Sequence, residues 1–237
     1  MAMIHLEPQT LEMFSRALDG LKPPPNLSLS QWADKYRKLS AEASASQGQW
    51  NTDAAPFQRE IMDAIGDVHV RKVVAMMCAQ AGKTEGLILN TIGFYMSYHP
   101  ASIMVMQPTV NLGESFSKDR LTPMLRDTPA LRGLVNTKSR YSGNTISKKN
   151  FPGGMLVIVG ANAPTDLRSR PIKVLLADEV DAYKASAGKE GNPVMLAEER
   201  QTTFWDYKTV MVSTPTTKAA SRILDEFNNS TQEEWTV

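Results

Sequence analysis

Residues 73–85, VVAMMCAQAGKTE, decide the fold. The run Val73–Met77 is apolar and contains β-branched residues, which is typical of a buried strand. A tight loop that ends in GKT follows, and the apolar residues after it predict a helix from Glu85 to about Tyr98. Phosphate binding requires this order of strand, loop and helix, because the N–H groups of the loop and of the helix N-terminus face the phosphates.

The loop predicts a nucleotide site with a magnesium ion. Lys83 would reach the β- and γ-phosphates of ATP, and the hydroxyl of Thr84 would ligate Mg²⁺. Met77 stands where the G-x-x-x-x-G-K-[ST] pattern has its first glycine, so an ordinary surface turn before a helix is the alternative. The residues expected to bind the nucleotide here are Gln80, Ala81, Gly82, Lys83, Thr84 and Glu85.

A second motif places two carboxylates at the end of an apolar strand. The run Val174–Ala177 leads directly into Asp178 and Glu179, and a doubly wound sheet binds its ligands at the carboxyl ends of its strands. Adjacent carboxylates repel each other unless a cation is near. We therefore expect Asp178 to hold Mg²⁺ and Glu179 to orient or deprotonate the attacking water, with Asp181 in a supporting role. A solvated acidic turn is the alternative.

Two weaker signals fit the same site. The polar stretch Ser213-Thr214-Pro215-Thr216 follows an apolar run, and hydroxyl groups at a strand tip are suited to sensing the γ-phosphate. Upstream, Gln58 follows Phe57 at the start of a helical stretch, and a glutamine amide can read the N6/N7 edge of adenine. The alternatives are an ordinary strand-ending turn and a helix start with core aromatics.

Five apolar, β-rich runs lie between residues 73 and 212, and longer segments separate them. They do not alternate with polar residues, which favours strands buried on both faces of a parallel sheet. The sequence thus predicts an α/β fold of the P-loop NTPase kind, with a mostly parallel sheet flanked by helices. The runs are Val73–Met77, Ile103–Met106, Leu156–Val159, Val174–Ala177 and Val210–Val212.

The chain is expected to divide into an N-terminal arm with a linker, residues 1–49, and a P-loop ATPase domain, residues 50–237. The arm should hold two short helical pieces, the second beginning at Ser30 and including Leu39, before an Ala/Ser/Gly-rich linker. A last helix is expected within residues 218–237. This division rests on composition and on turn residues.

Bulk composition excludes several classes of protein. The chain has 237 residues, of which 42% are hydrophobic and 22% charged, as in soluble globular proteins. Lys and Arg number 26 against 25 Asp and Glu, so a nucleic-acid contact needs a local patch. Cys78 is the single cysteine, which rules out an internal disulfide framework and suits a reducing compartment. We expect no signal peptide and no membrane span, because no apolar run approaches 18 residues.

A local basic patch lies between Thr128 and Thr165, a stretch without any Asp or Glu. We expect a flexible basic loop there that touches DNA phosphates without reading the sequence. A solvated loop with incidental charge is the alternative. The basic residues are Arg132, Lys138, Arg140, Lys148 and Lys149.

Taken in this order, the motifs resemble the GpA-type large terminase subunit of tailed phages and prophages. The resemblance covers most of the chain, from about Leu29 to Phe227. The residues that carry it are Ser30-Gln31-Trp32-Ala33, Ala55-Pro56-Phe57-Gln58-Arg59-Glu60, Ala79-Gln80-Ala81-Gly82-Lys83-Thr84-Glu85, Gln107-Pro108-Thr109, Phe151-Pro152-Gly153-Gly154, Gly160-Ala161-Asn162, Asp178-Glu179-Val180-Asp181 and Ser213-Thr214-Pro215-Thr216.

The resemblance implies an ATPase motor of the RecA/helicase-like ASCE type that uses glutamate as its base and packages double-stranded DNA into a procapsid, in the host cytoplasm. It also implies a small terminase subunit and the portal as partners. An arginine finger supplied by a neighbouring subunit would imply a ring of identical subunits, and a monomer is the alternative. By the same resemblance, Gln58 contacts adenine, and residues 213–216 couple hydrolysis to motion. A C-terminal nuclease domain is expected to be absent from this chain. A helicase-like DNA remodeller and a non-catalytic nucleotide-binding module are the competing functions.

One further stretch carries an expected catalytic residue. Leu167-Arg168-Ser169-Arg170 resembles the Leu-Arg-Gly-Arg stretch of large terminases, with Ser169 in place of the glycine. In that family an arginine can complete the site of a neighbouring subunit. The resemblance therefore makes Arg168 the expected arginine finger, with Arg170 second. The alternative is that both arginines make surface or domain-packing contacts.

Overall fold

The computed structural model of the chain describes residues 26–42, 47–136, 143–167 and 170–235. Its centre is a six-stranded sheet with the strand order β3-β8-β7-β4-β6-β5, in which only β5 runs antiparallel to its neighbour. The predicted mostly parallel α/β sheet is confirmed. The strands are β3 (Lys72–Met76), β4 (Ile103–Gln107), β5 (Lys148–Phe151), β6 (Gly154–Gly160), β7 (Val174–Asp178) and β8 (Lys208–Ser213).

The middle of the sheet explains the uninterrupted apolar runs. Strands β4 and β7 are buried along their whole length. Ile103 of β4 lies in register with Leu156 of β6 on one side and with Val174 of β7 on the other. Helices cover both faces of such a sheet, so neither set of alternating side chains reaches water.

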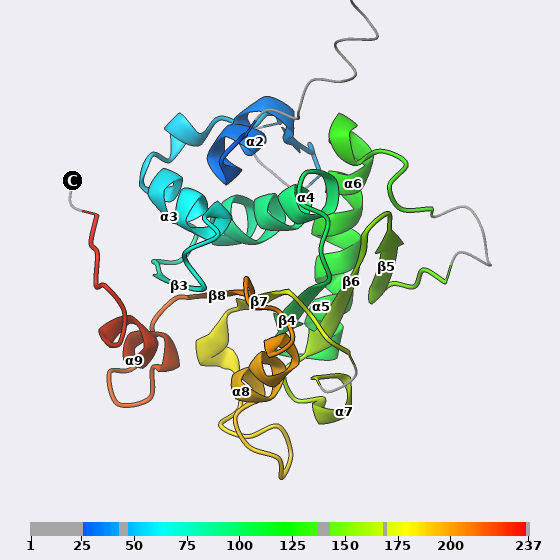
Figure 1. Ribbon diagram of the computed structural model, residues 1–237. Coiled ribbons are helices and arrows are strands. Elements are labelled where there is room, and N and C mark those ends of the chain that lie inside the picture. Colours follow the sequence, from blue (N-terminus) through cyan, green and yellow to red (C-terminus); the bar gives the residue numbers. More distant parts are fainter. Residues whose placement is uncertain (1–25, 43–46, 137–142, 168–169, 236–237) are drawn as a thin grey trace, which may run out of the picture.

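The helices form a layer on each face of the sheet (Figure 1). Helices α2 to α6 pack on one face, and α7 to α9 pack on the other. None of the described helices is long and apolar enough to span a membrane. The helices are α2 (Leu29–Tyr36), α3 (Phe57–Gly66), α4 (Asn90–Ser97), α5 (Val110–Phe116), α6 (Thr122–Asp127), α7 (Pro164–Leu167), α8 (Pro193–Glu198) and α9 (Arg222–Asn228).

The helix predicted after the loop is present, but it begins with wide turns. A π-helical segment, η2 (Thr84–Leu89), leads directly into α4, and the N–H of Asn90 donates to the carbonyl of Glu85. A second π segment, η3 (Ser117–Leu121), joins α5 to α6. A π turn holds one residue more than an α turn, and such turns occur frequently at functional sites. The sequence pattern did not indicate either segment.

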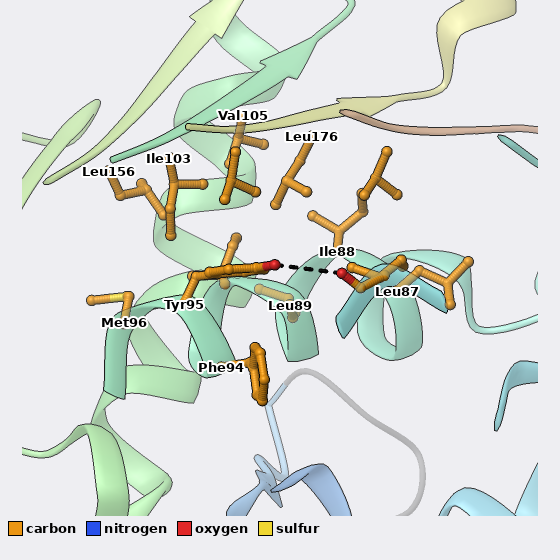
Figure 2. Packing of buried hydrophobic residues seen from close by; sticks show 14 of the residues in the cluster. Leu87, Ile88, Leu89, Phe94, Tyr95, Met96, Ile103, Val105, Leu156 and Leu176 are labelled. Atoms are coloured by element: carbon orange, nitrogen blue, oxygen red, sulfur yellow. Dashed lines mark hydrogen bonds between the residues drawn. The ribbon is translucent and has the colours of Figure 1, made fainter. Parts of the chain in front are cut away.

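The core between the sheet and the η2–α4 helix is apolar (Figure 2). Side chains of the helix, such as Leu87 and Ile88, are buried with side chains of the strands, such as Val105 and Leu176. The hydroxyl of Tyr95 reaches across to the carbonyl of Ile65, 3.4 Å away. This packing fixes the direction in which the helix leaves the loop.

The N-terminal arm packs into the same core as the sheet. Trp32 of α2 is buried, lies edge-on to Phe94, and donates a hydrogen bond from Nε1 to Ser97 Oγ at 3.2 Å. Leu39 lies in a short strand, β1 (Lys38–Leu39), that pairs with β2 (Gly48–Gln49), so its predicted helical conformation is wrong. The first helical piece expected in the arm lies outside the described residues.

The prediction of a flexible basic loop is wrong for two of its lysines. Lys148 and Lys149 lie on strand β5 at the edge of the sheet. The Nζ of Lys149 donates to the carbonyl of Ile146 at 3.2 Å and to the carbonyl of Thr145. Burial lowers the pKa of its ammonium group. Lys149 is therefore committed to the fold and unavailable to a phosphate. Lys138 and Arg140 lie outside the described residues.

Candidate active site

Three segments that are distant in the sequence meet at the carboxyl edge of the sheet. Strand β3 leads into the loop, β7 ends at Asp178, and β8 ends at Ser213. Strand β8 lies between β3 and β7, and because the three strands are parallel, their last residues lie at one edge. The structure thus brings together the phosphate loop, the acidic pair and the polar stretch.

Lys83 stands among these segments, although its side chain is only 6% exposed. Its Nζ donates to Thr214 Oγ1 at 2.6 Å and to the carbonyl of Cys78 at 3.2 Å. Glu179 Oε1 lies 3.3 Å from the same nitrogen. The ammonium group is therefore held in a fixed position at the start of η2, where a helix N-terminus also favours an anion.

The carboxylate of Asp178 is nearly buried and unevenly satisfied. Oδ2 accepts hydrogen bonds from Gln107 Nε2 at 3.1 Å and from Thr84 Oγ1 at 3.5 Å. Oδ1 is buried and has no partner among the described residues. Burial raises the pKa of this carboxyl group to about 6, because the charged form is poorly solvated there. A divalent cation would relieve both conditions.

The donor atoms at this position fit Mg²⁺. Carboxylate and hydroxyl oxygens are the ligands that this ion prefers, and it is commonly bound through one or two carboxylates together with substrate phosphates. Among the described residues, no group of three or more His, Cys, Asp or Glu could hold a metal. Asp178 and Thr84 therefore fit the predicted Mg²⁺ site as the two protein ligands of a metal that a nucleotide brings with it.

Gln107 is a site residue to which the sequence assigned no role. It ends β4, is buried, and orients Asp178 through the hydrogen bond described above. A polar residue at the end of an otherwise apolar strand was the available signal. That signal becomes specific only when β4 is known to lie beside β7 in the sheet.

Glu179 differs from its neighbour in conformation and in exposure. Its φ of 54° lies in the left-handed region, which residues with a side chain rarely adopt. Oε2 accepts from the N–H of Thr214 at 3.3 Å and from Ser213 Oγ at 3.4 Å, and the side chain is 41% exposed. Glu179 can therefore meet water, whereas the buried Asp178 is suited to a cation.

Asp181 fastens the polar stretch to the sheet edge. Its Oδ2 accepts from the N–H and from Oγ1 of Thr216, both at 2.9 Å, and its Oδ1 accepts from the N–H of Ile223 at 2.8 Å. Burial alone would raise the pKa of Asp181, but these bonds and one from Ser221 hold it below its usual value. Asp181 thus connects the end of β8 to the start of α9.

Gln58 lies against the phosphate loop and is 1% exposed. Its Nε2 donates to the carbonyl of Ala81 at 2.6 Å, and its Oε1 is buried without a partner among the described residues. Gly86 makes room for it, because a Cβ at that position would lie 1.9 Å from Oε1. In this arrangement the amide holds the loop, and it presents no exposed edge to an adenine base.

The carboxylate of Glu85 is engaged by two arginines. Oε2 lies 2.7 Å from Nη2 of Arg37, and Oε1 lies 3.4 Å from Nη1 of Arg120. Burial lowers the pKa of the Arg37 guanidinium and raises that of the Glu85 carboxyl group. The pair connects the N-terminal arm to η2. Because the two arginines engage the carboxylate of Glu85, it does not supply the predicted nucleotide contact.

The remaining predicted residues divide between the loop and the arginine stretch. Gln80 and Gly82 have φ angles of 58° and 74°, and these left-handed positions bend the loop back toward the helix. Arg168 lies outside the described residues. Arg170 Nη1 donates to Sδ of Met155 at 3.3 Å, on the side of the sheet away from Lys83 in strand order.

A cleft of about 920 Å³ adjoins the loop at the free edge of β3. Side chains of α3 and β3 line it, Phe57 among them, and Cys78 and Ala81 of the loop form its wall beside the active site. Phe227 and Trp235 line it as well. The cleft contains neither Lys83 nor the acidic pair, so it is a space beside the phosphate site and distinct from it.

Comparisons with known proteins agree with this arrangement. The family described as phage terminase large subunit gpA, ATPase domain, matches residues 44–237. The large terminase subunit of Enterobacteria phage P21 is 30% identical over 87% of this chain and 32% of its own length, and that of Escherichia phage lambda is 29% identical over 90% and 33%. The chain thus spans about one third of these relatives.

A solved structure shows the same fold. The large terminase of the HK97 bacteriophage superposes with a TM-score of 0.67 at 14% identity, over 86% of this chain and 41% of that protein. At this identity the likeness concerns the fold alone. Because the family match covers most of the sequence and includes the loop, the acidic pair and the polar stretch, the chain belongs to the family of the phage terminase large subunit gpA, ATPase domain.

Proposed function

We propose that this chain hydrolyses ATP as the motor domain of a large terminase subunit. The observation that carries the proposal is the ion pair between Lys83 and Glu179, which lies beside the partly unsatisfied carboxylate of Asp178. A phosphate-binding cation, a metal-binding carboxylate and an exposed carboxylate at one sheet edge are the parts that phosphoryl transfer to water needs.

When ATP binds, Lys83 would exchange its contact with Glu179 for one with the γ-phosphate. The γ-phosphate offers Lys83 a more highly charged acceptor than Glu179 does, so the ion pair at 3.3 Å is loosened. The Glu179 carboxylate is then free to orient a water molecule or to accept a proton from it, while Thr214 and Ser213 hold its Oε2. Thr214 touches both residues and is placed to respond to the γ-phosphate.

Thr84 and Asp178 are the residues proposed to hold Mg²⁺ with the nucleotide. When bound there, the ion offsets the negative charge of the phosphates and keeps the Asp178 carboxyl group ionised. Gln107 keeps the carboxylate turned toward the site through its hydrogen bond to Oδ2. The base of the nucleotide would enter the cleft beside the loop, near Phe57 and Ala81, and a contact of Gln58 with adenine remains a prediction.

The wider role rests on the family and not on the geometry. We propose that hydrolysis drives double-stranded DNA into a procapsid in the host cytoplasm, through contacts with the DNA backbone. The small terminase subunit and the portal are the proposed partners. Arg168 is the proposed finger that completes the site of a neighbouring subunit, in a ring of identical subunits.

Steady-state hydrolysis of Mg²⁺–ATP, measured over a range of protein concentrations, tests the proposal. Glu179→Gln should lower kcat by roughly 10²–10⁴-fold, the usual contribution of a general base, and keep nucleotide binding. Glu199→Gln, exposed on η6 (Glu199–Gln201), is the matched control and should keep full activity. Specific activity that rises with concentration would support a finger from a neighbouring subunit. Equal activity in both variants, or no nucleotide binding by the wild type, would contradict the proposal.

A further inference from the structure

Asn90 is a polar residue that the packing of the core does not explain. It is fully buried at the junction of η2 and α4. Neither its Nδ2 nor its Oδ1 has a hydrogen-bond partner among the described residues. Nearly all buried polar groups in proteins are paired, so each exception asks for a physical reason. A leucine would fill such a position without leaving two polar atoms unsatisfied.

A complementary group lies over Gly86, one turn before Asn90. Gln58 Oε1 is also buried without a partner among the described residues, and it lies over Gly86. Asn90 follows Gly86 by four residues, which places both on one face of the helix. Side chains of a helix lean toward its N-terminus, which directs a side chain at position 90 toward the turn that contains Gly86. Asn90 Nδ2 is a donor, and Gln58 Oε1 is an acceptor.

The wide turn between Gly86 and Asn90 supplies a way to bring the two side-chain amides together. The N–H of Asn90 donates to the carbonyl of Glu85, five residues earlier. If the turn tightened to an α turn, the same N–H would donate to the carbonyl of Gly86, and Asn90 would rotate relative to Gln58. Gln58 in turn holds the loop through its bond to Ala81.

We propose that Asn90 is a positioning residue for the phosphate loop, because its carboxamide donates to Gln58 Oε1 when a nucleotide is bound. The bond completes a chain from Asn90 through Gln58 to the carbonyl of Ala81, and so fixes the loop that carries Lys83. The inference rests on the proposed function in requiring a nucleotide, but it does not require hydrolysis.

The test replaces Asn90 with leucine, which has the same branching and no polar atoms. The probes are Mg²⁺–ADP and Mg²⁺–ATP, with binding measured by titration and folding by thermal melting. We expect the dissociation constant to rise about tenfold for both nucleotides, while the melting temperature holds or rises, because the change removes two unsatisfied polar atoms. Asn90→Ala serves in the same assay should leucine be too large for the site.

Thr91 provides the matched control. It is the next residue, is equally buried, and donates a hydrogen bond to the carbonyl of Leu87. Thr91→Val removes a satisfied hydroxyl, so it should lower the melting temperature and leave nucleotide affinity unchanged. The two neighbouring substitutions thus have opposite expected effects on stability and on binding.

A double-mutant cycle with Gln58→Leu shows whether Asn90 acts through Gln58. If it does, Asn90→Leu should add little to the loss of affinity that Gln58→Leu already causes, because one chain of hydrogen bonds is broken in either case. Additive losses, or an Asn90→Leu protein that binds both nucleotides as the wild type does, would overturn the inference alone. A wild type that binds neither nucleotide would overturn it together with the proposed function.

Discussion

At the amino end of the sheet the buried amide of Gln201 has all the partners it needs, whereas at the carboxyl end the buried carboxylate of Asp178 does not. Gln201 Nε2 donates to the carbonyls of Lys173 and Lys208 at 3.1 and 2.9 Å, and its Oε1 accepts from Thr209 Oγ1 at 2.7 Å. The chain completes this network by itself, so the network contributes to stability.

The carboxyl end collects groups that the described chain leaves unsatisfied. Buried oxygens of Asp178, Gln58 and Asn162 belong to this set. Nε of Arg200 is unsatisfied at the amino end, and Nε of Arg37 and both polar atoms of Asn90 are unsatisfied among the helices. Buried polar atoms without partners destabilise a fold, so a protein that gathers them at one edge gives up stability where a ligand binds. The difference separates residues kept for folding from residues kept for binding.

The largest expected contrast is between two of the buried lysines, Lys83 and Lys208. Lys83→Met should weaken binding of Mg²⁺–ADP and Mg²⁺–ATP by roughly a hundredfold or more, because Lys83 is the buried cation proposed to pair with the phosphates, and truncating one partner of such a charge pair costs about 2–5 kcal/mol. Lys208→Met, at the amino end, removes an ammonium group that donates to the carbonyl of Asp67 at 2.6 Å and should leave affinity unchanged. Titration with fluorescent nucleotide measures both, and equal losses of affinity would break the comparison.

The second contrast is the effect of pH on Asp178. The rise of its pKa from the ordinary 3.8 to about 6 corresponds to about 3 kcal/mol. Between these values the folded state binds a proton that the unfolded state has lost, so stability falls as pH rises from about 4 to 6. Asp178→Asn lacks this penalty and should be more stable than the wild type above pH 6, with the gap closing toward pH 4.

Thermal melts in EDTA at pH 4.5 and 7.5 measure the gap. In separate melts at pH 7.5 without EDTA, Mg²⁺ with ADP should stabilise the wild type and not Asp178→Asn, because the ion needs the ionised carboxylate. A gap that is the same at both pH values would show that burial of Asp178 carries no penalty, and the carboxyl end would then resemble the amino end.

Much of the site at the carboxyl end could be predicted from the sequence, because its motifs are contiguous stretches of the chain. The strand, loop and helix around Lys83 are contiguous, and the apolar run before Asp178 marks a buried strand without knowledge of its neighbours. The meeting of loop and acidic pair then follows from the general rule that parallel strands expose their carboxyl ends at one edge.

The rest depends on contacts between distant residues, which no local pattern encodes. Gln107 gains its role only because β4 lies next to β7. Lys149 looked like a solvated charge, but its strand pairing and two backbone carbonyls bury it. Glu85 sits in the loop motif, yet Arg37, 48 residues earlier, engages its carboxylate. Tertiary packing decided each of these cases.

A smaller effect is expected from breaking the complete network at the amino end. Gln201→Leu would leave the carbonyls of Lys173 and Lys208 and the hydroxyl of Thr209 without their partner. Each unsatisfied buried group costs about 1–3 kcal/mol, partly offset by the apolar side chain, so we expect a net loss of about 2 kcal/mol. For a domain of this size that lowers the melting temperature by roughly 4–8 °C. Unchanged nucleotide affinity would sharpen the comparison, and a matching loss of affinity would contradict it.

The smallest contrast concerns backbone strain at Glu179, whose φ of 54° is left-handed. Glycine adopts this conformation freely, whereas a residue with a Cβ loses roughly 1 kcal/mol there. Both Glu179→Gly and Glu179→Ala remove the carboxylate, so comparing them isolates the backbone. We expect the glycine variant to be more stable than the alanine variant by about 1 kcal/mol in chemical denaturation, the reverse of the usual order in regular structure. If alanine were the more stable, the left-handed backbone at Glu179 would carry no strain.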